Sequence, residues 1–313
     1  MQFSRVQKLI AISIACLILL LLPFIIRNQY LMHIIILSCL ESIIVIGFVA
    51  QYNVRLLTFC SAAFMGVGAY ISGLLSTRYG LNFWYCLPLA GIGTGLFAFL
   101  LGLLTVRAGW VTFLMISIVI SEIFVEVIGQ IPALGGWDGI IGIPRPAIGS
   151  FVFVSKVSYY YLGLGLVSVC VIIFIALYKS PIGKAWTAIG QSSDLAASLG
   201  INLFNYRMIA YIAASFTAGL SGSLYAHYSC YLVPNTFGII RSLQIPINAV
   251  VGGLHFVISG PIIGSIIMNA VPELLRITDR YELIFVGLMI ILCALFFRKG
   301  LMSIFRKDIT RGL

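Results

Sequence analysis

Three glutamates in otherwise apolar stretches are the residues whose position most suggests chemistry. They are Glu41, Glu122 and Glu126, and the last two are four residues apart. Residues at this spacing are neighbours on one face of a helix, so Glu122 and Glu126 could together bind a cation or a proton. In the alternative, Glu126 lies near a membrane surface and Glu122 hydrogen-bonds to a neighbouring helix. An ionised carboxylate is costly in lipid, so each should face the protein interior, water or a membrane interface.

Motifs typical of enzymes are absent from the sequence. It contains no G-x-x-x-x-G-K-[ST] phosphate loop, no H-E-x-x-H or G-x-S-x-G motif, and no cluster of Cys and His. His33, His227 and His255 are far apart, and an isolated histidine in a helical bundle is usually a hydrogen-bonded structural residue rather than a metal ligand. The seven cysteines show no C-x-x-C spacing and suit apolar packing. We therefore expect no enzyme, no cofactor and no metal site.

The composition is that of a membrane protein. Hydrophobic residues make up 61% of the 313 residues, charged residues make up 9%, and the mean hydropathy is +1.11. Soluble domains carry about 25% charged residues. Apolar runs of about 20 residues, the length that a bilayer requires, recur along the chain. We expect one all-α integral membrane domain over residues 1–313, a bundle of about ten transmembrane helices. The predicted spans are 9–26, 31–50, 57–77, 84–104, 110–130, 159–178, 206–229, 243–258, 260–275 and 282–297.

The distribution of positive charge predicts the orientation. An even number of spans places both termini on one side, and that side carries twelve of the 19 Lys and Arg residues. Cytoplasmic loops are enriched in these residues. Both termini and the polar segment 179–206 are therefore expected in the cytoplasm, and the loop 131–158 outside. The net charge of +10 is better explained by anionic lipid headgroups than by nucleic acid.

Small residues recur at alternating four- and three-residue spacing in three predicted helices. Such stripes allow helix backbones to approach closely, and packing explains them far more often than a ligand groove does. The stripes are Ala62, Gly66, Ala69, Gly73 and Ser76; Gly91, Gly95, Ala98 and Gly102; and Ser215, Gly219, Gly222 and Ala226.

Two segments are too rich in Gly and Pro to continue a helix. The loop 131–158 contains LGGWDGIIGIPRP and is long enough to cover an external opening. Residues 251–264 read VGGLHFVISGPIIG. Irregular backbone at membrane depth is tolerated only where protein buries it or it lines a cavity, and interrupted helices hold binding sites in transporters. An ordinary turn between two helices is the slightly favoured alternative.

The polar segment carries signals for two short helices. A helical turn is expected at about 184–189, ending at Gly190, and a second turn, capped by Ser192 or Ser193, should end at Gly200. Two capped turns make a rigid unit, which suggests that another protein docks there. A helix lying on the membrane surface is the weaker alternative, because the segment is expected to be neither strongly basic nor strongly amphipathic.

Four sets of residues resemble one transporter family. The stretch GKAWTAIGQSSDLAASLGINLFNYRMIAY (183–211) resembles the cytoplasmic loop of permease subunits of branched-chain amino-acid ABC importers. LGGWDGIIGIP (134–144) resembles an external-loop motif of the LivM kind of subunit, as distinct from its LivH partner. The remaining matches are AAFMGVGAY (62–70), AGLSGSLYAHY (218–228), VPNTF (233–237), VVGGL (250–254) and GPIIG (260–264), all in the family's order.

The resemblance implies a multi-pass permease of the bacterial cytoplasmic membrane. Such a subunit would form half of a translocation path for branched-chain or similar small amino acids. Its partners would be a second, homologous permease of the LivH kind, two ATPase subunits that hydrolyse ATP, and an external solute-binding protein. The polar segment would then be the coupling helix that binds in a groove of an ATPase subunit.

The resemblance also directs the choice of site residues. In the expected solute path, backbone groups of small residues and one tyrosine would bind a zwitterionic solute: Gly66, Gly68, Tyr70, Gly252 and Gly253. Glu122 would bind the ammonium group of the solute. The expected ATPase contact consists of Asp194, Ala196, Ala197 and Gly200.

The chain departs from the family pattern at several positions, which leaves the solute open. YNVRLLTFCS (52–61) replaces a glycine-rich G-Y-A-G-Q-L-S-L-G-H, Leu134 replaces the usual threonine, and His255 and Phe256 follow GGL in place of smaller residues. Urea and short amides are alternative solutes. A self-sufficient secondary carrier or channel is a second hypothesis, which would need groups for a coupling ion. An integral-membrane enzyme is disfavoured, because no His, Asp and Cys cluster is present.

Overall fold

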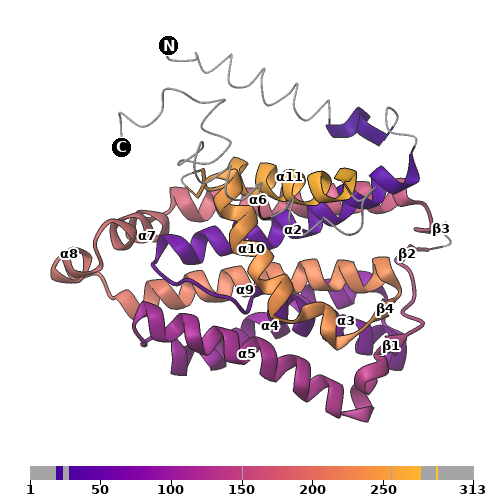
Figure 1. Cartoon of the computed structure of the whole chain (residues 1–313), viewed down its shortest axis with the longest axis horizontal. Helices are drawn as coiled ribbons and strands as arrows, with labels where there is room; N and C mark the ends of the chain where they lie inside the picture. The colour runs from indigo at the N-terminus through magenta and orange to yellow at the C-terminus, as the bar shows by residue number, and fades with distance from the viewer. Residues whose placement is uncertain (1–18, 24–27, 150, 255, 276–286, 288–313) are drawn as a thin grey trace.

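The computed structural model describes residues 19–23, 28–149, 151–254, 256–275 and 287. Long helices lie side by side along one axis of the molecule (Figure 1), which confirms the all-α prediction. Six of them correspond to predicted spans: α2 (Gln29–Asn53), α3 (Ser61–Tyr79), α4 (Phe83–Thr105), α5 (Trp110–Gln130), α6 (Lys156–Lys179) and α9 (Leu203–Ser229). Shorter helices are α7 (Pro181–Gln191), α8 (Ser193–Ser198), α10 (Ile239–Gly252) and α11 (Ser259–Leu275).

Five described helices, α2, α4, α5, α6 and α9, are long and apolar enough to cross a membrane. The 19-residue α3 is less apolar because it is rich in Ser, Gly and Tyr. The expected number of about ten spans is not confirmed. The predicted spans 9–26 and 282–297 lie mostly outside the described residues. The predicted span 243–258 corresponds to α10, whose 14 residues are fewer than predicted and fewer than a bilayer usually requires, and the predicted span 260–275 corresponds to α11, which has 17 described residues.

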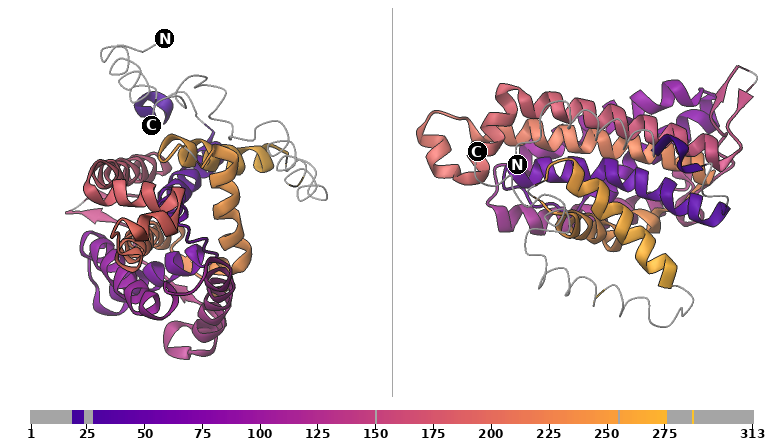
Figure 2. Two further views of the ribbon diagram at one scale, coloured as in Figure 1. Left: turned by 90° about the vertical axis from the view of Figure 1, so that its left-hand side faces the viewer. Right: turned by 90° about the horizontal axis from the view of Figure 1, so that it is seen from above.

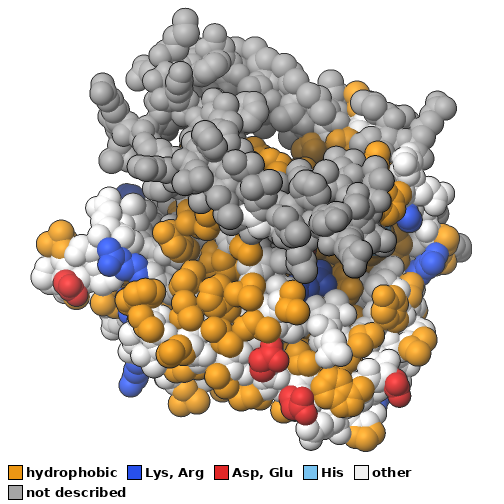
Figure 3. Space-filling model, in the orientation of Figure 1, with side chains coloured by type: hydrophobic (Ala, Val, Ile, Leu, Met, Phe, Trp, Pro, Cys, Tyr) orange, Lys and Arg blue, Asp and Glu red, His pale blue; other side chains and the backbone are white. Residues whose placement is uncertain are grey.

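Helices α2 and α9 form the centre of the bundle. In their most apolar stretches 78% and 72% of the residues are buried, against 22% to 33% in α4, α5 and α6. Helix α9 packs against α4, α3 and α2, and α2 also packs against α11 and α6. The outer helices leave large apolar side chains exposed, as lipid contact requires, and such side chains cover much of the face seen in Figure 3, where charged groups are few.

The small-residue stripes lie where helices touch, which confirms the packing interpretation. A Cβ atom on Gly68 would collide with the backbone of Gly219, and one on Gly222 would collide with the carbonyl oxygen of Met65. These contacts bring α3 and α9 together at backbone distance, so any larger side chain would force them apart.

The loop 131–158 is folded rather than open. Its described residues contain two 3₁₀ turns and three short strands: η1 (Pro132–Leu134), η2 (Gly136–Asp138), β1 (Ile140–Ile141), β2 (Ala147–Ile148) and β3 (Phe151–Val152). A further strand, β4 (Tyr231–Leu232), and η3 (Pro234–Phe237) follow α9. Strand β1 pairs antiparallel with β4, and β2 with β3. Gly139, with φ of 79°, lies against the carbonyl oxygen of Leu232, so a side chain there would break the attachment of the loop to the end of α9.

The interruption at 251–264 is a connection between two short helices, the alternative that the sequence slightly favoured. Helix α10 ends at Gly252, Gly253 has φ of 109°, and α11 begins at Ser259. The two helices cross closely, because Cβ atoms on Gly252 and Gly264 would collide with the carbonyl oxygens of Gly260 and Asn248. We call α10 and α11 the α10–α11 hairpin; it lies on one side of the bundle (Figure 2, left).

Helix α7 is longer than predicted. It begins at Pro181, where a missing N–H is tolerated, and continues through Gly190 to Gln191. The prediction that Gly190 ends the helix is wrong. Glycine is required there for a different reason: a Cβ atom would lie 2.6 Å from the carbonyl oxygen of Asn53, at the end of α2.

The predicted limits of the second turn are confirmed. The Ser192 side chain accepts a hydrogen bond from the backbone N–H of Leu195 and so caps α8. Gly200, with φ of 83°, follows the end of α8.

Candidate functional site

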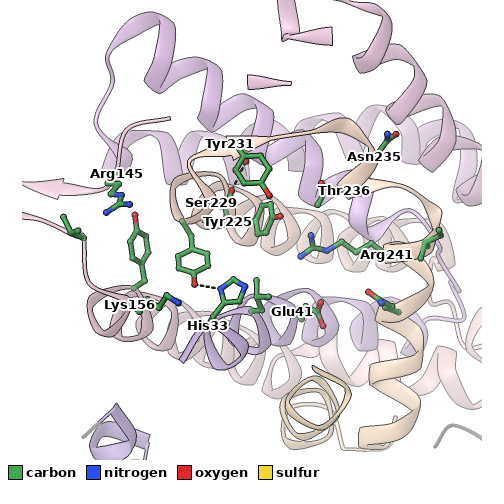
Figure 4. Close-up of a pocket in the computed structure, with 16 residues that line it drawn as sticks. His33, Glu41, Arg145, Lys156, Tyr225, Ser229, Tyr231, Asn235, Thr236 and Arg241 are labelled. Atoms are coloured by element: carbon green, nitrogen blue, oxygen red, sulfur yellow. Dashed lines mark hydrogen bonds between the residues drawn. The ribbon is translucent and has the colours of Figure 1, made fainter. Parts of the chain in front are cut away.

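A cavity of about 680 Å³ lies between α2, α9 and α10, towards the end of the bundle that carries the strands (Figure 4). We call it the tyrosine-lined cavity. In an otherwise apolar bundle its lining combines apolar residues with many polar ones: four tyrosines, one histidine, one acid and three cations, namely Tyr159, Tyr225, Tyr228, Tyr231, His33, Glu41, Arg145, Lys156 and Arg241.

The acid of the cavity is Glu41, in the middle of the central helix α2. Its side chain is 8% exposed. Its Oε2 atom accepts hydrogen bonds from Asn248 Nδ2 at 2.8 Å and from Asn269 Nδ2 at 2.7 Å. Because Asn248 belongs to α10 and Asn269 to α11, Glu41 joins the α10–α11 hairpin to α2.

The cations of the cavity come from separate elements, and two of them, Arg241 and Lys156, are fixed by contacts of their own side chains. The guanidinium carbon of Arg241 lies 4.8 Å above the centre of the Tyr225 ring, a cation–π arrangement. Lys156 Nζ donates to the carbonyl oxygen of Gln29 at 3.0 Å. Arg145 follows Pro144, whose carbonyl oxygen is fixed by a hydrogen bond from the buried His227.

His227 is a structural histidine, as the sequence predicted for isolated histidines. Its Nδ1 lies 2.6 Å from the carbonyl oxygen of Pro144, and its Nε2 lies 2.9 Å from Ser72 Oγ. A carbonyl can only accept, so Nδ1 donates and Nε2 of a neutral ring accepts from the Ser72 hydroxyl. This buried chain ties α3 and α9 to the loop that carries Arg145.

Tyrosine rings form a rigid wall. The Tyr228 hydroxyl is 2.5 Å from His33 Nδ1, and the rings of Tyr159 and Tyr228 meet edge to face with centroids 5.1 Å apart. The Tyr159 hydroxyl donates to the carbonyl oxygen of His227 at 2.7 Å. Sequence reasoning missed these residues. They come from distant segments, and a tyrosine in a membrane helix carries no local signal for a cavity.

A second cavity, of about 1210 Å³, lies beside α7. Helix α7 is at the end of the bundle opposite to the strands (Figure 1). Tyr52 and Asn53 of α2 line it, with the cations Arg55 and Lys184. Between the two cavities, residues 42–51 of α2 are all buried. In this structure the centre of the bundle therefore separates them.

The residues predicted for a solute path lie elsewhere among the described residues. Gly66 and Gly68 lie in helix contacts. The Tyr70 side chain is 3% exposed, between the rings of Phe124 and Phe237, and its hydroxyl has no hydrogen-bond partner in the described part of the chain. None of the three lines either cavity, and their contact with a solute stays a prediction.

The remaining predicted path residues also have packing contacts. Gly252 and Gly253 form the end of α10 and its turn. Glu122 Oε1 accepts a hydrogen bond from the backbone N–H of Ile239, the first residue of α10, at 3.1 Å. Glu126 instead accepts a hydrogen bond from Gln130 Nε2 at 2.6 Å, so the two acids form hydrogen bonds with different residues.

The residues predicted to contact an ATPase differ in their exposure. Ala196 is buried against the bundle, whereas Asp194, Ala197 and Gly200 are exposed. Two leucines that sequence reasoning did not select are exposed beside them: Leu195 in α8, with 61% of its surface exposed, and Leu199 at the C-terminal cap of α8, with 73%. Their four-residue spacing was the available signal, since it places both on one helical face.

Comparisons with known proteins identify the family. Residues 30–294 match the model of the branched-chain amino acid transport system / permease component family. The high-affinity branched-chain amino acid transport system permease proteins LivM of Salmonella typhimurium LT2 and Escherichia coli K12 are each 26% identical over 272 residues, which is 79% of this chain and 63% of theirs. A probable LivH permease protein of Methanocaldococcus jannaschii is 28% identical over 249 residues, 75% of this chain and 76% of its own.

The chain thus spans less than two thirds of the length of the two LivM relatives. No solved structure matches it significantly. Its apolar helices and its relatives make it a multi-pass membrane protein. Since the family model covers most of its length, the chain belongs to the permease-component family of branched-chain amino acid transport systems.

Proposed function

We propose that this chain is the permease subunit of an ATP-driven importer and forms half of the path for branched-chain or similar small amino acids. The observation that carries the proposal is the tyrosine-lined cavity, in which the buried acid Glu41 and the cation Arg241 face one space inside an apolar bundle. Charged groups in a membrane bundle mark solute or ion pathways. The sequence contains no phosphate loop, and in this proposal partner subunits supply the ATP-driven work.

The arrangement of the cavities supports alternating access. In this proposal the end of the bundle that carries the strands faces outside, and the end with α7 and α8 faces the cytoplasm. Both termini are also proposed to lie in the cytoplasm. The tyrosine-lined cavity would receive the solute, and the cavity beside α7 would release it. Because residues 42–51 of α2 are buried between the two cavities, passage requires a rearrangement of the bundle.

The proposed partners are a second, homologous permease, two ATPase subunits and an external solute-binding protein. Helix α8 is proposed to contact an ATPase through Asp194, Ala197 and Gly200 together with Leu195 and Leu199, while Ala196 supports this surface from beneath. Its base is rigid: Trp186 of α7 is fully buried, and its Nε1 donates to the carbonyl oxygen of Tyr206 at 3.0 Å.

The proposal is tested on the complex purified with a tagged chain from its own membranes. Mass spectrometry should identify the partners, and proteoliposomes that hold the complex should accumulate leucine only with ATP. Ala197→Trp should abolish uptake while membrane insertion persists. Ala176→Trp, at an exposed position of α6 outside the polar segment, is the matched control and should transport normally. Accumulation of leucine by the chain alone under an ion gradient would instead identify a secondary carrier.

A further inference from the structure

Glu41 lacks a positively charged partner within the described part of the chain. Its hydrogen-bond donors there are the amides of Asn248 and Asn269, and no lysine, arginine or histidine of the described residues forms an ion pair with it. An amide satisfies a carboxylate oxygen but, being neutral, does not cancel its charge. A buried carboxylate without a cation is costly, so a cation from outside the chain would be stabilised at this position.

Glu41 lies at the inner end of the tyrosine-lined cavity. The lining residues from α2 are His33, Leu37 and Glu41, which follow one another at four-residue spacing. They form one stripe along the helix, and this stripe extends about 12 Å along the helix axis over eight residues. The next residues of α2, 42–51, are all buried, so the cavity goes no further along this helix than Glu41.

Arg241 is the complementary group. It projects from the first turn of α10 and stacks on Tyr225, and it makes no hydrogen bond or ion pair with the other described residues. Figure 4 shows the Arg241 and Glu41 side chains both pointing into the cavity, from α10 and α2. A stacked guanidinium is fixed in place while its N–H groups remain available, and these groups match a carboxylate in a two-point contact.

We propose that Glu41 binds the ammonium group of a zwitterionic amino acid and that Arg241 binds its carboxylate. This inference rests on the proposed import function and adds the basis of its selectivity. The apolar side chain of the solute would lie against Leu37 and the ring of Tyr225. A site with two opposite charges rejects a solute that lacks either one, because the unmatched charge would stay buried and unpaired. Urea and short amides, which carry neither charge, would bind poorly.

The test is equilibrium binding of radiolabelled leucine to the full chain in nanodiscs, with competition by two analogues. Isocaproate lacks the amino group of leucine, and isoamylamine lacks its carboxylate. For the wild type, each analogue should compete roughly 10- to 100-fold less well than leucine, the factor expected for one charge-assisted contact. Glu41→Gln should lower leucine affinity by a similar factor and remove the preference for leucine over isocaproate. Arg241→Gln should remove the preference over isoamylamine.

Two controls separate these effects from loss of folding. Glu126→Gln removes a carboxylate from a membrane helix outside the cavity and should leave both preferences unchanged. Size-exclusion profiles of the variants should match the wild type. If Glu41→Gln does not yield folded protein, Arg241→Gln tests the same binding orientation independently, since it must affect one analogue and not the other.

Three outcomes would overturn the inference. Wild-type leucine binding with unchanged preferences in both variants would leave the import function intact and remove the charge assignment. Leucine binding that requires Na⁺, with that requirement lost in Glu41→Gln, would assign Glu41 to an inorganic cation. Absence of leucine binding and of ATP-driven leucine uptake by the purified complex would instead contradict the proposed function itself, and the inference with it.

Discussion

The Arg55 guanidinium donates a hydrogen bond to the carbonyl oxygen of Gln191, the last residue of α7, at 2.9 Å. Its Nε also donates to the carbonyl oxygen of Gly190 at 3.3 Å. The last carbonyls of a helix have no partner within the helix and carry partial negative charge, so a cation is stabilising there. Arg55 lies two residues after the end of α2, so these hydrogen bonds attach the end of the central helix to the end of α7.

We predict that Arg55→Gln weakens this attachment. The contact is exposed, so the free energy of unfolding should fall by only about 1 kcal/mol. The effect on transport should be larger, because movement of α7 would no longer be passed fully to α2. ATP hydrolysis and leucine uptake should be measured in the same proteoliposomes, and we expect less leucine per ATP. Lys184→Gln, which removes a cation from α7 itself, is the control; an equal loss there would indicate a general effect of charge.

Replacement of Trp186 should release α7 from the bundle. The side chain is fully buried, and large-to-small substitution of such a residue costs about 3–5 kcal/mol. Trp186→Ala should therefore lower the thermal stability of the purified chain strongly. Trp186→Phe retains much of the packing and loses the hydrogen bond to Tyr206, so its stability should be intermediate. Equal stability of both variants would show that packing around Trp186 does not fix α7.

The contact between α3 and α9 should tolerate no side chain larger than hydrogen at Gly68. A Cβ atom there would collide with the backbone of Gly219, which cannot move without moving α9. Gly68→Val should reduce the amount of folded, monodisperse protein in detergent by a large factor. Gly165→Val, in α6, is the matched control, because a Cβ atom at Gly165 meets no atom within 4 Å. Similar yields from both variants would contradict the packing interpretation.

The exposed leucines of α8 should matter for assembly and not for folding. The double variant Leu195→Ser and Leu199→Ser removes apolar surface from two exposed leucines, one in α8 and one at its C-terminal cap. Stability of the isolated chain should change by less than about 0.5 kcal/mol, as is usual for surface positions. Co-purification of the ATPase subunits should fall severalfold. Retention of the ATPases at the wild-type level would place the contact elsewhere.

The sequence alone determined which residues form the long helices. Apolar runs of about 20 residues are a local property that the thickness of a bilayer imposes, and six predicted spans agree closely with α2 to α6 and α9. Capping signals are local as well, which is why the predicted cap at Ser192 or Ser193 and the predicted end at Gly200 agree with α8. Short motifs in order along the chain were enough to indicate the family.

Only the tertiary structure decided where the polar groups meet. Membrane helices are apolar on all sides, so the sequence pattern does not tell which face points inwards. Glu41 receives its two hydrogen bonds from residues 207 and 228 positions away, and such contacts depend on how whole helices pack. The same holds for Gly190, whose glycine is required by the approach of Asn53 rather than by a helix end. Local signals fixed the elements, and packing between distant segments formed the cavity.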